Sequence, residues 1–592
     1  MTIDLPGLML NPYEAGYSSI SLSGRSIYDL ALIPNSQSVC QLIDILRTAC
    51  RQHGLHLITF CPLGLDAGTQ HLSDLDRATL EKELNRHSLL VRTDDSQEQL
   101  MRSLRGLAEL AKSPPGERKW SDGKTMSLCI LLEFGQHILP TQNEAANHND
   151  LQVLAAELLH TAAQSVALNS GNNYIIVHTA DCTQLDPLVA SVLRPVRLPQ
   201  PDEEEKAAFL AAAISAYPDA SFVPGVDIRS ASNLSSRTAN RSSHQLVVES
   251  HLLKRPITPL DLFQQKQRDV AAQSEGTLRL LDTRRIQGIT LHGSNVRVVQ
   301  KMLGHFSSGL LRGDTKMPCN ICLCGPPSTG KTELALQTAV AARVPAFELV
   351  SAKSGIVGET ERKARLQQQL LADYGGVVFA DELTEILPTQ RNEFDGDSGA
   401  SRAVGGALLQ GLSDTSRQGR LLFIGATNTP WRIGEALRSR FLFIPVLRAT
   451  KSDYPLIVAA LAQRIDSSLQ IELNDPGFLR SAYSFYEKLA SPREILSALQ
   501  VTRVLSGGRL DLETIEHAAA NTSSVGDLRS IIHCELAAIQ ACPLDSFLPW
   551  ADDPMGYDWP DYFEGIVDKR TGKVDRGMLS KKCAELAEVS NV

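Results

Sequence analysis

The sequence predicts an α/β fold with two parallel sheets in one chain, and three observations support this prediction. A glycine-rich loop at 325–332 lies between a short apolar run and a segment of helical character. Apolar runs that end in polar or acidic residues recur along the chain, for example at 375–382, which is typical of buried parallel strands. Landmarks of the first half return in the second half at a nearly constant spacing. Such a repeat indicates an internal duplication.

Length, charge and cysteine content narrow the class of protein. The chain has 592 residues and a net charge of −9, and this length corresponds to about three or four domains. The mild acidity disfavours a surface built to grip nucleic acid. The eleven cysteines are odd in number and scattered, which favours reduced thiols over a disulfide framework. Because the start lacks signal-peptide character and no long apolar run follows, we expect a cytoplasmic protein without a membrane span.

The loop at 325–332 matches the pattern G-x-x-x-x-G-K-[ST]. The preceding run, 321–324, predicts a buried strand, and 333–342 predicts a helix. In that setting the backbone N–H groups and the positive helix end would bind phosphate. Lysine and threonine at the end of the loop would bind the β/γ-phosphates of ATP and a Mg²⁺ ion; the alternative is a chance glycine turn. The predicted nucleotide-binding residues are Gly325, Pro326, Pro327, Ser328, Thr329, Gly330, Lys331 and Thr332, with Thr332 also a Mg²⁺ ligand.

Two carboxylates follow the apolar strand predicted at 375–380. Asp381 at the strand end can hold the Mg²⁺ shell, and Glu382 can polarise an attacking water. An apolar run that ends in Asp-Glu is common at protein surfaces, so the preceding phosphate loop is what favours catalysis.

A third pattern follows at 420–441, where Ala426-Thr-Asn-Thr-Pro leads to two arginines before Phe441. With these three motifs, residues from about 280 to 505 resemble an AAA-type (AAA+) ATPase of the protein-remodelling branch that includes katanin, spastin and N-ethylmaleimide-sensitive factor. The resemblance implies an α/β fold of two P-loop-NTPase-type (AAA) parallel-sheet sandwiches, each with a small helical lid. It also implies that ATP and Mg²⁺ are the cofactors.

The resemblance implies roles for further residues. Asn428 would sense the γ-phosphate, while Arg438 and Arg440 would reach the nucleotide of a neighbouring subunit, which ties hydrolysis to assembly. Arg493, in a lid segment at 491–495, would contact the γ-phosphate. The adenine-packing positions would be Ile286 and Gly288, and the pore-loop positions would be Ile356, Val357 and Gly358. The pore loop of this branch carries an aromatic residue where this chain has isoleucine, which weakens the expectation of strong unfolding activity.

The first half repeats these landmarks without the phosphate loop. Glu133 lies 248 residues before Asp381, the run 174–181 lies 247 before 421–428, and 193–199 lies 246 before 439–445. We expect a degenerate copy that neither binds Mg²⁺-ATP strongly nor hydrolyses it, because the lysine is missing and Phe134 stands in the place of Glu382. The alternative is an unrelated adaptor domain.

Other segments of this half carry weaker signals. The nearest candidate for a phosphate loop is 57–69, which has no lysine. Helices are predicted at 202–214 and near 261–272, and a loop is predicted at 230–243. Arg194, in the sequence-based alignment, is the counterpart of Arg440.

These inferences give a domain plan and a leading function. The plan is a degenerate AAA-like domain with its lid at 1–272, an active core at 273–447, a helical lid at 448–545, and an aromatic, acidic tail at 546–592. The tail is either an exposed strap or an anchored terminus. We expect a homohexameric ATPase that remodels or disassembles a protein complex. The alternatives are a nucleic-acid-directed motor or loader, although nucleic acid is the less favoured partner, and an ATP-gated scaffold with residual hydrolysis.

Overall fold

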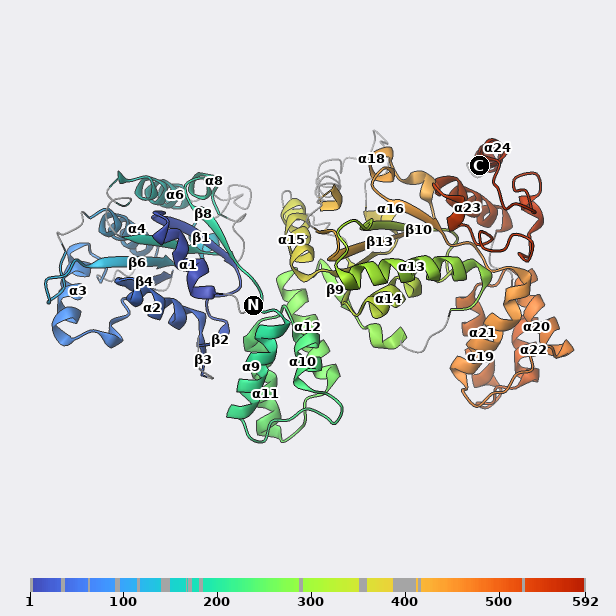
Figure 1. The fold of residues 1–592 in the computed structure, drawn as a ribbon, viewed down its shortest axis with the longest axis horizontal. Coiled ribbons are helices and arrows are strands. Elements are labelled where there is room, and N and C mark those ends of the chain that lie inside the picture. The colour runs from blue at the N-terminus through green and yellow to red at the C-terminus, as the bar shows by residue number, and fades with distance from the viewer. Residues whose placement is uncertain are drawn as a thin grey trace. The chain divides into compact units, whose positions relative to one another are not determined.

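The computed structural model of the chain contains two compact units, Met1–Val270 and Ala271–Val592, which are described separately (Figure 1). The described residues are 4–33, 38–61, 64–90, 96–113, 118–139, 150–166, 168, 173–179, 185–286, 291–350, 359–386, 411–413, 417–523 and 527–589. In these residues no helix is both long and apolar enough to cross a membrane.

Unit 1 is built on a six-stranded sheet of order β5-β4-β6-β7-β1-β8, parallel except for the edge strand β5. Apolar side chains cover both faces of this sheet. Its strands are β1 (Ser19–Gly24), β4 (Leu55–Cys61), β5 (Gly64–Asp66), β6 (Ser127–Leu132), β7 (Tyr174–His178) and β8 (Arg194–Leu198), with a small hairpin of β2 (Leu30–Leu32) and β3 (Val39–Gln41). The helices around the sheet are α1 (Leu5–Glu14), α2 (Leu42–Gln52), α3 (Asp74–Arg86), α4 (Ser96–Lys112), α5 (Gly135–Ile138), α6 (Asp150–Ala163) and α8 (Pro187–Ala190).

A separate helical part completes unit 1. It contains α9 (Glu203–Ala216), α10 (Ile228–Ser235), α11 (Asn240–Leu253) and α12 (Pro259–Gln273). The helices predicted at 202–214 and 261–272 are confirmed. The loop predicted at 230–243 is wrong, because α10 and α11 occupy most of it. Asp227 starts α10 by accepting a hydrogen bond from the Ser230 N–H at 2.7 Å, so a cap that precedes the polar stretch begins the first of these helices.

The core of unit 2 has a second six-stranded sheet, of order β14-β10-β13-β12-β11-β9, again parallel except for its edge strand β9. Strands β12 and β13 are buried throughout, as expected for a sheet covered on both faces. Its strands are β9 (Leu278–Leu281), β10 (Asn320–Cys324), β11 (Ala346–Leu349), β12 (Gly376–Ala380), β13 (Leu421–Thr427) and β14 (Leu442–Pro445). The helices of the core are η4 (Thr283–Ile286), α13 (Ser294–Arg312), α14 (Lys331–Ala342), α15 (Glu359–Tyr374), α16 (Leu383–Ile386), η6 (Pro430–Arg432) and α18 (Glu435–Arg438).

The five parallel strands have the same order and register in both sheets, which confirms the α/β fold with two parallel sheets. The antiparallel edge strands differ, because β5 follows β4 in the chain whereas β9 precedes β10. Leu132 ends β6 and Ala380 ends β12, and these two residues lie 248 positions apart. Leu132 pairs with Val177 and Ala380 pairs with Gly425, and these partners also lie 248 positions apart. In the next strand of each sheet, Ser21 pairs with Val177 and Cys322 pairs with Gly425, so Ser21 corresponds to Cys322. Strand β1 is therefore the counterpart of β10, and the strand at 55–61 is the counterpart of β11.

This register changes two of the sequence-based equivalences. The phosphate-loop counterpart in unit 1 is the turn after β1, and the candidate at 57–69 is wrong. Arg194 corresponds to Leu442, because Arg194 pairs with Ile20 and Leu442 with Ile321. The Arg194 guanidinium lies 4.2 Å from the centre of the Tyr17 ring, and this contact gives the arginine a structural role.

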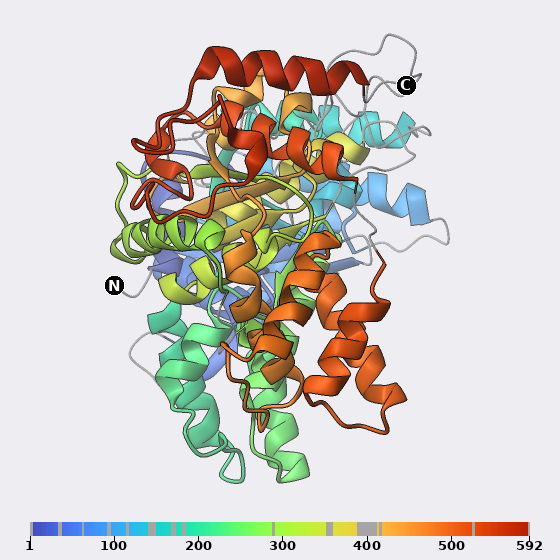
Figure 2. The same ribbon diagram turned by 90° about the vertical axis from the view of Figure 1, so that its right-hand side faces the viewer.

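Two further groups of elements belong to unit 2. A helical bundle follows the core, and a C-terminal segment packs on the core at another side, as Figures 1 and 2 show in orange and dark red. The bundle contains η7 (Lys451–Asp453), α19 (Tyr454–Ile465), α20 (Pro476–Glu487), α21 (Pro492–Leu505) and α22 (Leu512–Asn521). The C-terminal segment contains α23 (Leu528–Ala541), η8 (Asp545–Phe547), η9 (Asp561–Phe563) and α24 (Arg576–Val589). Helix α23 contacts β14, η6 and α24.

The aromatic tail is packed against the rest of unit 2. Trp550 is 1% exposed, and its indole N–H donates to the Gly572 carbonyl at 2.9 Å. Its ring contacts those of Tyr557, Trp559 and Phe563. The tail also contacts the rest of unit 2, because the Ser452 N–H donates to the Asp558 carboxylate at 3.0 Å and the Tyr562 hydroxyl hydrogen-bonds the Glu535 carboxylate. The anchored form of the tail is therefore the one observed.

Candidate active site

The glycine-rich loop leaves β10 at a point where only glycine fits. Gly325 has φ 151°, and a Cβ atom on it would lie 2.0 Å from the Val446 carbonyl oxygen. Gly330, with φ 90°, immediately precedes α14, and Ser328 also adopts a left-handed conformation with φ 59°. These conformations turn the chain sharply from strand to helix, and they leave the first N–H groups of α14 without helical partners.

Lys331 is the first residue of α14 and points back into this loop. Its ammonium donates to the carbonyl oxygens of Gly325, at 2.9 Å, and Pro326, at 2.6 Å. The side chain is buried, and burial lowers the pKa of Lys331, while the nearby Asp381 carboxylate is among the groups that oppose this effect. A buried ammonium whose hydrogen-bond partners among the described residues are two carbonyls of its own loop is well placed for phosphate oxygens.

The two carboxylates lie at the end of β12, where the sequence predicts them. Asp381 and Glu382 are both exposed, and the Glu382 N–H donates to the Asp381 carboxylate at 3.1 Å. Glu382 has φ 48°, so the chain reverses at this residue. Thr332, half-buried in the first turn of α14, completes the residues that suit a Mg²⁺ ion, which prefers oxygen ligands.

Asn428 follows the neighbouring strand β13 directly. Its side-chain Oδ1 is buried and accepts no hydrogen bond from the described residues. Since a buried amide oxygen is costly without a donor, this atom is suited to an ordered water or a ligand. Lys331, Asp381 and Asn428 therefore meet at the carboxyl edge of one parallel sheet, where ligands bind in α/β folds.

Residues 321–448 match the family described as "ATPase family associated with various cellular activities (AAA)". The second unit contains an AAA ATPase domain. Human fidgetin-like protein 1 is 36% identical over 148 residues, which are 24% of this chain and 21% of that protein. The meiotic spindle formation protein mei-1 of Caenorhabditis elegans is 35% identical over 133 residues, 21% of this chain and 28% of its own.

A third relative of the AAA domain is the ATP-dependent zinc metalloprotease FtsH of Mesomycoplasma conjunctivae, 29% identical over 210 residues, which are 33% of this chain and 27% of that protein. The chain thus spans between about a fifth and just over a quarter of the length of these curated relatives. The resemblance to AAA ATPases of a protein-remodelling branch is confirmed for the AAA domain.

The predicted arginines of the AAA domain lie on its surface. Arg438 and Arg440 are exposed. The Arg438 guanidinium donates to the Pro430 carbonyl at 3.4 Å, and the Arg440 Nε–H donates to the Ser413 hydroxyl at 2.8 Å. Arg493 is exposed in the first turn of α21. The roles of these arginines stay predictions.

Several predicted positions are only partly described. Ile286 is the last residue of η4, which contacts α14, whereas Gly288 and the pore-loop residues Ile356, Val357 and Gly358 lie outside the described residues.

Helix α23 is a part of the AAA domain's site that the sequence did not reveal. The thiol of Cys534, on this helix, donates to the Asn428 carbonyl at 2.9 Å. Cys534 is also one of the groups whose proximity opposes the lowering of the Lys331 pKa by burial. No motif marks this helix. The only available signal was an amphipathic segment after the bundle.

The corresponding place in unit 1 is occupied by charged side chains of its own. Gly24 ends β1 with φ 94°, and a Cβ there would lie 2.5 Å from the Leu198 carbonyl oxygen, as at Gly325. The next residue, Arg25, is 1% exposed. Its guanidinium pairs with Asp29 at 2.6 Å and with Glu205 of α9 at 2.7 Å.

The same cluster reaches a second helix of the helical part. Asp29 accepts the N–H groups of Asn240, at 3.1 Å, and Arg241, at 2.8 Å, which are the first residues of α11. The carboxylate therefore caps that helix. The Tyr28 hydroxyl hydrogen-bonds the carboxylate of Glu133, the counterpart of Asp381.

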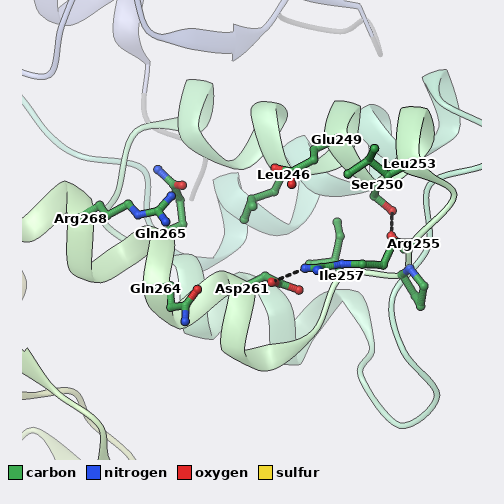
Figure 3. A pocket seen from close by; sticks show the side chains of 11 residues that line it. Leu246, Glu249, Ser250, Leu253, Arg255, Ile257, Asp261, Gln264, Gln265 and Arg268 are labelled. Carbon is green, nitrogen blue, oxygen red and sulfur yellow. Dashed lines mark hydrogen bonds and ion pairs between the residues drawn. The ribbon is translucent and has the colours of Figure 1, made fainter.

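A cavity of about 230 Å³ lies between α11 and α12 of unit 1 (Figure 3). Arg255 and Asp261, which both line it, form an ion pair at 2.6 Å. No residue of the predicted site lines this cavity.

Proposed function

We propose that the AAA domain hydrolyses ATP in a Mg²⁺-dependent reaction, in a homohexameric ring formed by copies of this chain. The proposal rests on one observation: Lys331, Asp381 and Asn428 lie at the same carboxyl edge of one parallel sheet. The family match supports it, because the matched family is one of ATPases.

Each residue of the site has a part that its position supports. The N–H groups at the start of α14 and the Lys331 ammonium would bind the β- and γ-phosphates. Thr332 and Asp381 would hold Mg²⁺, which when bound neutralises charge on the phosphate oxygens. Glu382 would accept a proton from the attacking water, and the unsatisfied Oδ1 of Asn428 would orient that water.

The exposed arginines favour a reaction that is completed by assembly. Arg438 and Arg440 lie at the surface, on the segment that follows Asn428. An arginine supplied from another subunit would stabilise the charge of the transition state. Arg493 at the start of α21 would report γ-phosphate binding to the helical bundle.

We propose a protein complex as the substrate of the ring, which would remodel or disassemble it. The relatives of the AAA domain support a protein substrate, and the acidic chain disfavours nucleic acid. The relative with protease activity matches only part of this chain, and no H-E-x-x-H sequence occurs in the chain.

The charged cluster of unit 1 favours a structural role for this unit. That role supports a second candidate function for the chain, an ATP-gated scaffold with residual hydrolysis. Arg25, Asp29 and Glu205 satisfy one another at the position next to Gly24, where unit 2 has its phosphate loop. We propose that 1–272 is a degenerate AAA-like domain that holds its helical part without nucleotide. The boundaries 273–447, 448–545 and 546–592 belong to the same proposal.

The test is the Lys331→Ala variant of the full chain, with ATP affinity measured by calorimetry and hydrolysis by phosphate release. ATP binding should be lost in the range where the wild type saturates. Lys301→Ala is the matched control, since this exposed lysine of the same core forms an ion pair with the exposed Asp552 at the surface, and it should behave as wild type. Unchanged ATP affinity in Lys331→Ala would contradict the site. Stimulation of hydrolysis by DNA but not by a protein extract would favour the nucleic-acid alternative.

A further inference from the structure

Helix α23 holds the peptide group that follows Asn428. The carbonyl of that peptide accepts the Cys534 thiol at 2.9 Å, and its N–H, on Thr429, donates to the Thr427 hydroxyl at 3.0 Å. Both polar ends of one peptide plane are therefore fixed, one by β13 and the other by α23. Because the Asn428 side chain leaves the backbone at this plane, its direction depends on both contacts.

The residue after Cys534 ties the same helix to the junction between core and bundle. Glu535 is buried and accepts the Arg448 N–H at 2.5 Å. Arg448 reaches the bundle, where its guanidinium donates to the Tyr486 carbonyl at 2.6 Å and lies 4.6 Å from the centre of that ring. The hydroxyl of Tyr562, from the tail, hydrogen-bonds the same Glu535 carboxylate.

The residue before Cys534 contacts the segment that leads to the exposed arginines. The His533 ring lies 4.4 Å from the Trp431 ring, centre to centre, and Trp431 belongs to η6, between Asn428 and α18. Three consecutive residues of α23 thus contact the strand end, the junction and the arginine segment. Cys324, which precedes the phosphate loop, also donates its thiol to the Ala538 carbonyl of this helix at 3.8 Å.

We propose that Cys534 is a positioning residue for ATP hydrolysis, which fixes Asn428 through its backbone carbonyl, and that Glu535 couples this placement to the helical bundle. The inference rests on the proposed ATPase function. Cys534 has no direct part in the chemistry: it is buried and acts through the Asn428 peptide.

The experiment compares three substitutions in the full chain. Cys534→Ala removes the donor, and the single-turnover hydrolysis rate should fall by about tenfold, as expected when a reacting group is displaced, while ATP affinity stays near that of the wild type. Cys534→Ser retains a donor at the same position and should recover most of the rate. Cys542→Ala is the matched control, because its buried thiol, on the residue that ends the same helix, donates to the Leu544 carbonyl at 3.2 Å, and its hydrolysis rate should not change.

A double-mutant cycle with Asn428→Ala decides whether Cys534 acts through that residue. If it does, Cys534→Ala should have no further effect once Asn428 is removed. Additive losses, or equal losses in Cys534→Ala and Cys542→Ala, would overturn the proposal.

A readout independent of activity separates this proposal from the ATPase assignment. Hydrogen exchange in the 427–432 peptide should be faster in Cys534→Ala than in Cys542→Ala or the wild type, with or without nucleotide. Equal exchange in all three proteins would reject the positioning role. Failure of the proposed function would instead appear as identical phosphate release by the wild type and Lys331→Ala.

Discussion

Phe134 and Glu382 occupy the same position at the ends of corresponding strands, and both have a left-handed backbone, with φ 56° and 48°. A non-glycine residue rarely adopts this conformation. Since Phe134 has no group that could activate water, the conformation follows from the turn that the fold requires at this strand end. In unit 2 the same turn presents a carboxylate, and we expect this difference to separate an active domain from an inactive one.

Glu382→Gln should leave ATP bound and slow its hydrolysis by about 100-fold or more, because the amide cannot take a proton from water. Nucleotide retention after gel filtration and phosphate release measure the two effects. The oligomer should also be more stable with ATP, as analytical ultracentrifugation would show. Normal turnover would remove Glu382 from the mechanism.

Arg440→Ala should abolish hydrolysis without changing ATP affinity, because the exposed guanidinium is proposed to act on a neighbouring subunit. Mixed with Glu382→Gln subunits, it should regain part of the activity, since some interfaces then combine an intact glutamate with an intact arginine. Native mass spectrometry verifies mixing. Mixed rings that remain inactive would exclude a role in trans.

Arg25→Leu should destabilise unit 1 by about 3–5 kcal/mol, because it leaves Asp29 buried without its cation. Faster hydrogen exchange in α9 and α11 of the full chain would show the loss. Arg47→Ala is the control in the same unit, since its pairs with Asp44 and Asp66 include well-exposed carboxylates, and it should cost no more than about 1 kcal/mol. ATP affinity should not change in either variant.

Acid should weaken unit 1 through His178. Burial lowers the pKa of His178 from 6.5 to about 4, against a hydrogen bond to the Arg25 backbone. Between these values the unfolded chain binds a proton that the folded chain does not, so stability should fall as the pH drops from 6.5 towards 4, by up to about 3 kcal/mol. Hydrogen exchange in the β7 peptide, corrected for intrinsic rates, should show this trend in the wild type and a weaker one in His178→Gln. If hydrogen exchange in the wild type and in His178→Gln depended equally on pH, the loss of stability in acid would be due to groups other than His178.

The sequence predicted those parts of the fold and site that depend on local chemistry. The phosphate loop, the carboxylates after β12 and the strand before Asn428 are each marked by consecutive residues, and the structure places the elements as expected. Their catalytic roles stay predictions. The repeat was visible in the sequence with a spacing that fell from 248 to 246, whereas strand register gives a constant 248 from β6, β7 and β8 to β12, β13 and β14. The spacing from β1 to β10 is larger, and no pattern in the sequence showed it.

The remaining features depend on contacts between distant residues. The turn at Gly24 has no phosphate-binding pattern, and its equivalence to Gly325 follows from the strand register and from the close approach of Leu198. The buried pair of Arg25 with Glu205 joins residues 180 positions apart. The contact of Cys534 with Asn428 spans 106 positions, and no periodicity or motif reports such a pairing.

The contact of α23 with the phosphate-loop strand also has a consequence for biosynthesis. Cys324 and Ala538 are 214 positions apart in the chain. At about 5–20 residues per second, the ribosome needs roughly 10–40 seconds to synthesise the segment between them. During that interval the edge of the sheet beside β10 and β14 lacks its covering helix and exposes apolar surface. Nascent chains should therefore engage chaperones most strongly after the core has emerged and before α23 has.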